Sequence, residues 1–100
     1  MRRGTTPTIK LIVDGLSKLE LRTAVLTIKQ RAVVIERTLD QMTIKTDSLA
    51  VTLTQKDTLA LMPGIDAEVQ LRCLTLSGTA YASDVLQLPV EKILKDGELI

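Results

Sequence analysis

The sequence predicts an all-β protein, a two-sheet β-sandwich of about seven strands with one short helical crossover near residues 55–61. Apolar and polar side chains alternate with a period of two along most of the chain. Turn-forming residues interrupt this alternation roughly every ten residues. Only one segment departs from the period, and it carries the signals of a helix start. A small barrel is the main alternative architecture.

The first half of the chain contains three predicted strands. The first spans residues 8–13 and ends at the turn-forming Asp-Gly pair at 14–15. The second spans 21–30, is rich in threonine and β-branched residues, and turns at 30–32 into its hairpin partner at 33–38. The side chains that we expect to face the core are Ile9, Leu11 and Val13 in the first strand and Ala24, Leu26 and Ile28 in the second.

Four further strands are predicted in the second half. Two short ones, at 42–45 and 49–53, are joined by a compact Thr-Asp-Ser turn. The segment 67–74 has the most regular alternation in the chain, and the last strand spans 83–90. Because Pro89 cannot donate a backbone hydrogen bond, this last strand should lie at a sheet edge or stop pairing there. Its side chains expected to face the core are Leu86, Leu88 and Val90.

The helical crossover is predicted between the fifth and sixth strands. Thr54 suits the N-cap position, and Asp57 follows three residues later, which is close to the pattern of a capping box. Apolar residues at 59–61 then precede the helix-breaking Pro63. We expect about one to two turns of helix that carry the chain from one sheet to the other.

Length and charge limit the size of the domain and its class of partner. One hundred residues make a single domain, 1–100, in which residues 1–5 and 96–100 are expected to be loosely held. Thirteen basic and twelve acidic side chains give a net charge of +1, so we expect no broad basic surface for nucleic acid or anionic lipid. No apolar run has the length of a membrane span, and we expect a protein that is cytosolic or assembled from the cytosol.

The residue types that are absent exclude much chemistry. The chain has no His, Trp or Phe, and Tyr81 is its only aromatic residue, so it lacks the residues for a histidine-based metal site, a catalytic triad or a base-stacking platform. The single cysteine, Cys73, lies on the apolar side of its strand and is expected to be a buried thiol. Ser83 and Asp84 are neighbours on a strand and would point to opposite faces. We therefore expect no enzyme activity, no metal and no cofactor.

Six residues are candidates for an interface. Arg2 and Arg3 supply too few charges to bind a nucleic-acid duplex, and we expect them to form a solvated start to the first strand. If they do bind a partner, an acidic protein surface is one option. Nucleic acid, as a third hypothesis for the function, is the other. Four apolar side chains fall out of phase with the core-facing rows, namely Ile12, Val25, Val34 and Leu74. Either they form a contact surface, or a loop, a helix or a different register covers them. An open sheet edge that accepts a strand is a second mode of contact.

Several stretches occur together in an order that resembles a known group of proteins. They are RRGTTPT at the start, VTLTQKDTLAL at 51–61, EVQLR at 68–72, ASDVLQLPV at 82–90 and ILKDGE at 93–98. Over nearly its whole length the chain is similar to a family of small phage and prophage proteins of Gram-positive (Firmicute) bacteria, whose genes often lie in the tail region. One departure from the family is the lack of Phe and other aromatic side chains at core positions.

The resemblance implies an Ig-like β-sandwich, similar to the N-terminal domain of baseplate upper proteins, with no catalytic residues. The leading hypothesis combines this resemblance with the missing catalytic residue types and the out-of-phase apolar side chains. It is a structural or adaptor protein of the phage tail or baseplate that contacts phage structural proteins, with a homo-oligomer as a further option. From the charge and composition we expect no nucleic acid and no membrane as a partner. Such a protein would lie in the host bacterial cytoplasm before assembly and then in the virion. The alternative function is a host-directed accessory module that binds a bacterial protein or surface ligand.

Overall fold

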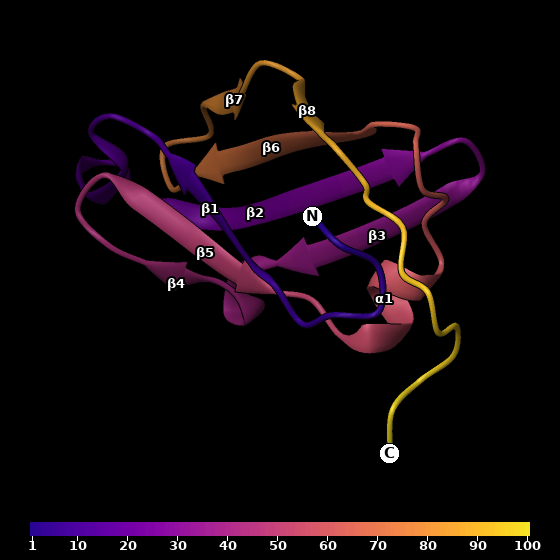
Figure 1. The fold of residues 1–100 in the computed structure, drawn as a ribbon. Coiled ribbons are helices and arrows are strands. Elements are labelled where there is room, and N and C mark those ends of the chain that lie inside the picture. Colours follow the sequence, from indigo (N-terminus) through magenta and orange to yellow (C-terminus); the bar gives the residue numbers. More distant parts are fainter.

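The protein folds into two antiparallel β-sheets that pack face to face, so the predicted all-β, two-sheet architecture is confirmed (Figure 1). The computed structural model describes all residues from 1 to 100. The strand order is β1-β5-β4 in the three-stranded sheet and β3-β2-β6-β7 in the five-stranded sheet, where β8 also pairs with β6. The strands are β1 (Thr8–Ile12), β2 (Leu21–Gln30), β3 (Val33–Thr38), β4 (Thr43–Ile44), β5 (Ser48–Thr52), β6 (Ala67–Thr75), β7 (Ala80–Ala82) and β8 (Leu86–Leu88).

One α-helix, α1 (Gln55–Leu59), carries the chain from the three-stranded sheet to the five-stranded sheet. The predicted capping box forms at its start: Thr54 Oγ1 accepts from the backbone N–H of Asp57 (3.1 Å), and Asp57 Oδ2 accepts from that of Thr54 (2.8 Å). Two short 3-10 turns, η1 (Leu16–Lys18) and η2 (Leu39–Gln41), complete the elements. The structure contains no helix with the length and apolar character needed to cross a lipid bilayer.

The hydrophobic core lies between the sheets and is built on the two long strands β2 and β6. Their register pairs Leu26 with Leu71 and Ile28 with Val69, so that both strands present an apolar row to the same face. Burial of such rows is the main favourable contribution to folding. The fifteen buried apolar residues of the core are Leu11, Leu16, Ala24, Leu26, Ile28, Ile35, Leu49, Val51, Leu53, Leu61, Ala67, Val69, Leu71, Cys73 and Val90.

A buried glutamine fixes the loop that follows α1. Gln30, at the end of β2, is only 4% exposed, and its Nε2 donates to the carbonyl oxygens of Met62 and Ile65 (2.9 Å each). Its Oε1 accepts from the backbone N–H of Met62 at 2.6 Å. A buried amide that makes all of these bonds avoids the desolvation penalty of an unpaired polar group. The side chain therefore holds the crossover loop against the end of the β2–β3 hairpin.

The C-terminal strand prediction differs from the structure. In place of one strand at 83–90, two short strands, β7 and β8, pair with the two ends of the same edge of β6. They are separated at Ser83, whose Oγ accepts from the backbone N–H of Leu71 (3.0 Å), so a side chain takes the place of a ladder partner. Leu86 is 47% exposed rather than buried, because no strand of the three-stranded sheet lies in front of β8 (Figure 1).

Candidate interaction surface

The six candidate residues lie in three separate places. Val25, Val34 and Leu74 belong to the outer face of the five-stranded sheet, as their cross-strand partners show, whereas Ile12 lies on the outer face of the three-stranded sheet. The two arginines at positions 2 and 3 lie at the end of the sandwich near α1 and the C-terminal segment. The candidates therefore do not form one continuous patch.

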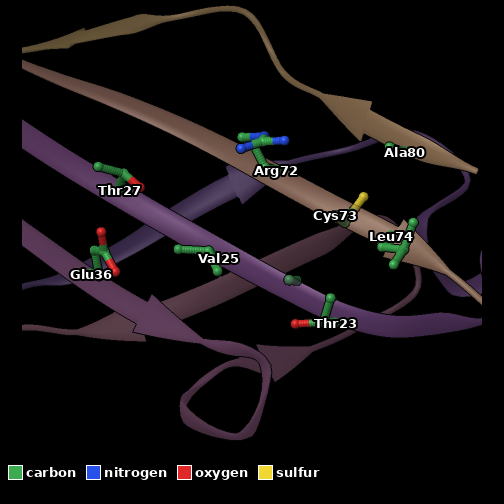
Figure 2. A pocket seen from close by; sticks show the side chains of 9 residues that line it. Thr23, Val25, Thr27, Glu36, Arg72, Cys73, Leu74 and Ala80 are labelled. Carbon is green, nitrogen blue, oxygen red and sulfur yellow. The ribbon is translucent and has the colours of Figure 1, made fainter.

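The outer face of the five-stranded sheet carries a shallow hollow of about 470 Å³ (Figure 2). Its apolar floor includes Val25, Leu74 and Ala80, which come from β2, β6 and β7. Arg72 on β6 and Glu36 on β3 stand on either side of Val25. The complete lining is Thr23, Ala24, Val25, Thr27, Glu36, Arg72, Cys73, Leu74 and Ala80.

Strand register explains why these side chains meet. Val25 is paired with Arg72, and Leu74 is paired with Thr23 on one side and Ala80 on the other. Directly paired residues point to the same face of a sheet, so the two out-of-phase apolar residues of β2 and β6 become diagonal neighbours. Val34 shares this outer face and is 50% exposed, but it pairs with Lys29, farther along the hairpin, and does not line the hollow.

The two charged residues beside the hollow have no ion-pair partners within the protein. Neither Arg72 nor Glu36 takes part in any of the four ion pairs, and neither side chain is hydrogen-bonded to another residue. Sequence reasoning identified Val25 and Leu74 as interface candidates but missed these two charges and Ala80. The β2–β6 register that brings them together could have been found by aligning the two apolar rows of these strands.

Cys73 belongs to the core side of β6 even though it also lines the hollow. It is 8% exposed and is paired with Ala24 and Tyr81, so the predicted buried thiol is confirmed. Burial raises the pKa of the Cys73 thiol above its ordinary value. The thiol is therefore protonated at neutral pH and is poorly suited to act as a nucleophile.

The two N-terminal arginines bind groups of their own chain. Arg3 donates to the carbonyl oxygens of Leu61 (2.6 Å) and Leu59 (2.8 Å) and forms an ion pair with Asp96 (2.9 Å). Arg2 is paired with Glu91 (2.7 Å) and donates to the carbonyl oxygen of Lys92 (2.8 Å). The start of the chain, which the sequence suggested was loosely held and solvated, is thus hydrogen-bonded to residues at the other end, and Arg3 is largely buried.

A second pair of charges connects β3 to α1. The Arg37 guanidinium is bonded to the Asp57 carboxylate, and both side chains are mostly enclosed. Burial alone would raise the pKa of Asp57, but the hydrogen bonds from Thr54 and the neighbouring Arg37 charge together hold it below its ordinary value. Because Asp57 also belongs to the capping box, this pair fixes the position of the helix and has a structural role.

A comparison of the chain with protein-family models, curated proteins and solved structures finds no match. An apolar floor beside two unpaired charges of opposite sign, on a wide and open sheet face, is suited to contacts with another protein's side chains.

Proposed function

We propose that this protein is a non-enzymatic structural or adaptor component of a phage or prophage particle, and that it acts in the tail or baseplate through contacts with other phage structural proteins. The hollow over β2, β6 and β7 is the observation that carries the proposal of a binding function. The outer face of a solvent-facing sheet is expected to be polar, and here it holds Val25, Leu74 and Ala80 beside the unpaired Arg72 and Glu36.

The phage setting is supported by the sequence resemblance, from RRGTTPT at the start to ILKDGE near the end. The Ig-like subclass of the sandwich, the host cytoplasm as the site of synthesis and the virion as the final location belong to the same proposal. A small rigid sandwich with a preformed contact face is suited to joining larger proteins, because little conformational entropy is lost when it docks.

The proposal is tested by producing particles from cells that carry the gene with Leu74→Glu or, as a matched control, Ile44→Glu. Ile44 is an exposed apolar residue of the other sheet, so both variants add one charge to a strand surface. We expect mass spectrometry of purified particles to find the wild-type and Ile44→Glu proteins and to show a loss of about tenfold or more for Leu74→Glu, since a charge in a desolvated contact is costly. A wild-type protein that is absent from particles would contradict the proposal.

A further inference from the structure

The edge strand β1 has a free side. Leu53 donates its N–H to the carbonyl of Pro7 (3.0 Å), and Val13 donates to that of Asp47 (2.8 Å), one at each end of the β1–β5 ladder. In an antiparallel ladder the bonded pairs alternate, so odd-numbered residues of β1 point their backbone groups toward β5. The N–H and C=O groups of Thr8, Lys10 and Ile12 therefore point away from the sheet, and none of them forms another backbone bond.

The other sheet edges are shorter or already occupied. On β3, the outward N–H of Thr38 is bonded to Gln41 Oε1 (2.9 Å), and the carbonyl of Glu36 accepts from Arg37 Nη1 (3.0 Å). The strands β4, β7 and β8 contain only two or three residues each. The side of β1 is thus the longest sheet edge on which consecutive outward backbone groups are all free, and such an edge is a template for another strand.

On the side of the molecule where the free edge of β1 lies, the core-facing side of the five-stranded sheet is incompletely covered. Tyr81 is paired with Cys73 and Leu86 with Val69, so both face the core side of the five-stranded sheet, yet they are 50% and 47% exposed. Figure 1 shows β7 and β8 beyond β6 with no strand in front of them, and β1 is the strand of the smaller sheet nearest to them. A fourth strand beside β1 would extend the smaller sheet toward these two side chains.

We propose that β1 binds an extended segment of a partner protein as an added strand. This inference rests on the protein-binding function proposed above and identifies β1 as the element that binds the partner. The segment carries apolar side chains at alternate positions, which face Tyr81 and Leu86, and acidic side chains between them. The acidic residues follow from charge complementarity: Lys10 stands in the middle of the edge, forms no ion pair, and is paired on β5 with the uncharged Ala50.

A second copy of this chain fits the edge less well than a single foreign strand. Antiparallel pairing that uses all three outward positions would set the two Lys10 side chains directly against each other, and like charges directly opposite are unfavourable. The edge also has only five residues, compared with about 20–30 residues a side in a stable interface. An added strand needs no such area, because its backbone hydrogen bonds supply much of the affinity.

The probe for this inference is the seven-residue peptide Thr-Val-Glu-Val-Glu-Val-Thr, acetylated and amidated. At a peptide concentration about ten times the dissociation constant, we expect hydrogen exchange, followed by NMR, to slow about tenfold at the amides of Thr8, Lys10 and Ile12. A version of the peptide that is N-methylated at every peptide nitrogen keeps the side chains but has no backbone donors, and it should give no protection. Equal binding of both peptides, or protection at β3 in place of β1, would overturn the inference.

Two proline variants provide a matched pair. Lys10→Pro removes an N–H that makes no bond within the protein, so the strand is retained and peptide binding should be lost. Val34 follows the hairpin-closing pair Gln30 and Val33 and likewise directs its N–H away from β2, so Val34→Pro should fold and keep binding.

Undiminished binding by Lys10→Pro would refute the strand-addition mode, and so would concentration-dependent dimers in light scattering that this variant abolishes, because the occupant would then be a second copy. If the peptide does not bind but the wild-type protein is found in particles, this inference alone is overturned. If the wild-type protein is absent from particles, the proposed function is overturned.

Discussion

At the scale of single residues, long polar side chains hold together segments that are far apart in the sequence. Arg3 bonds to the carbonyl groups of Leu59, the last residue of α1, and Leu61, and it also bonds to Asp96. Gln30 bonds to both sides of the loop that follows that helix. The value of each bond depends on burial, because an exposed ion pair is weakened by water and salt. The two neighbouring arginines provide a direct comparison of the two environments.

We predict that Arg3→Ala lowers the free energy of unfolding by about 1–3 kcal/mol, because it leaves partly buried carbonyl groups without a donor. Arg2→Ala should cost no more than about 1 kcal/mol, since its ion pair with Glu91 is exposed to solvent. Urea unfolding of the two variants measures the difference. Equal losses of stability would show that the bonds of Arg3 contribute no more than a surface ion pair.

At the scale of elements, local sequence signals set most boundaries. The β2–β3 hairpin begins and ends at the predicted residues, because β-branched alternation and a two-residue turn at 31–32 agree with each other. The capping box of α1 was likewise readable from Thr54 and Asp57. The division of the last strand into β7 and β8 could not be predicted from the sequence. It depends on a hydrogen bond between Ser83 and Leu71, which no local sequence pattern indicates.

Because of the Asp57 carboxylate, the stability with which α1 is held in place depends on pH in the acid range. Its pKa is lower in the folded protein than its ordinary value of 3.8, so the ionised form contributes stability above that pH, and this contribution is lost as the pH falls through the folded-state pKa. We predict that Asp57→Asn lowers the free energy of unfolding by about 1–2 kcal/mol near neutral pH. The difference from wild type should shrink as the pH falls below 3.8.

Thermal melts of both proteins across this pH range provide the measurement. A difference in stability that is the same at neutral and acidic pH would mean that the charge of Asp57 plays no part in holding the helix.

At the scale of the whole molecule, one core joins both sheets, with Leu26 and Leu71 from one and Leu49 and Val51 from the other. Which in-phase residues enter this core was only partly predictable. Leu26 and Leu86 both lie in alternating apolar rows that were predicted to face the core. Burial depends on whether the opposite sheet covers the strand, and no strand of the three-stranded sheet lies in front of β8. The same limit applies to the candidate surface, where single apolar residues were identified but their charged neighbours required the sheet register.

We predict that Leu26→Ala lowers the free energy of unfolding by about 2–5 kcal/mol, because this side chain is only 1% exposed and its removal leaves a cavity between the sheets. Ile12→Ala, a similar truncation at a side chain that is 69% exposed, should change it by only about 0.5 kcal/mol. Urea unfolding followed by circular dichroism should show one transition for each variant. Two separate transitions in Leu26→Ala would indicate that the sheets do not share one core.

The reactivity of the buried Cys73 thiol can be used to measure how often the surrounding strands open. Cys73 carries the sole thiol of the chain and is only 8% exposed, and burial raises its pKa, so a maleimide should react with it faster when the strands around it separate. The speed of alkylation in native buffer thus reports how often this part of the sandwich opens, with no dye or engineered label required.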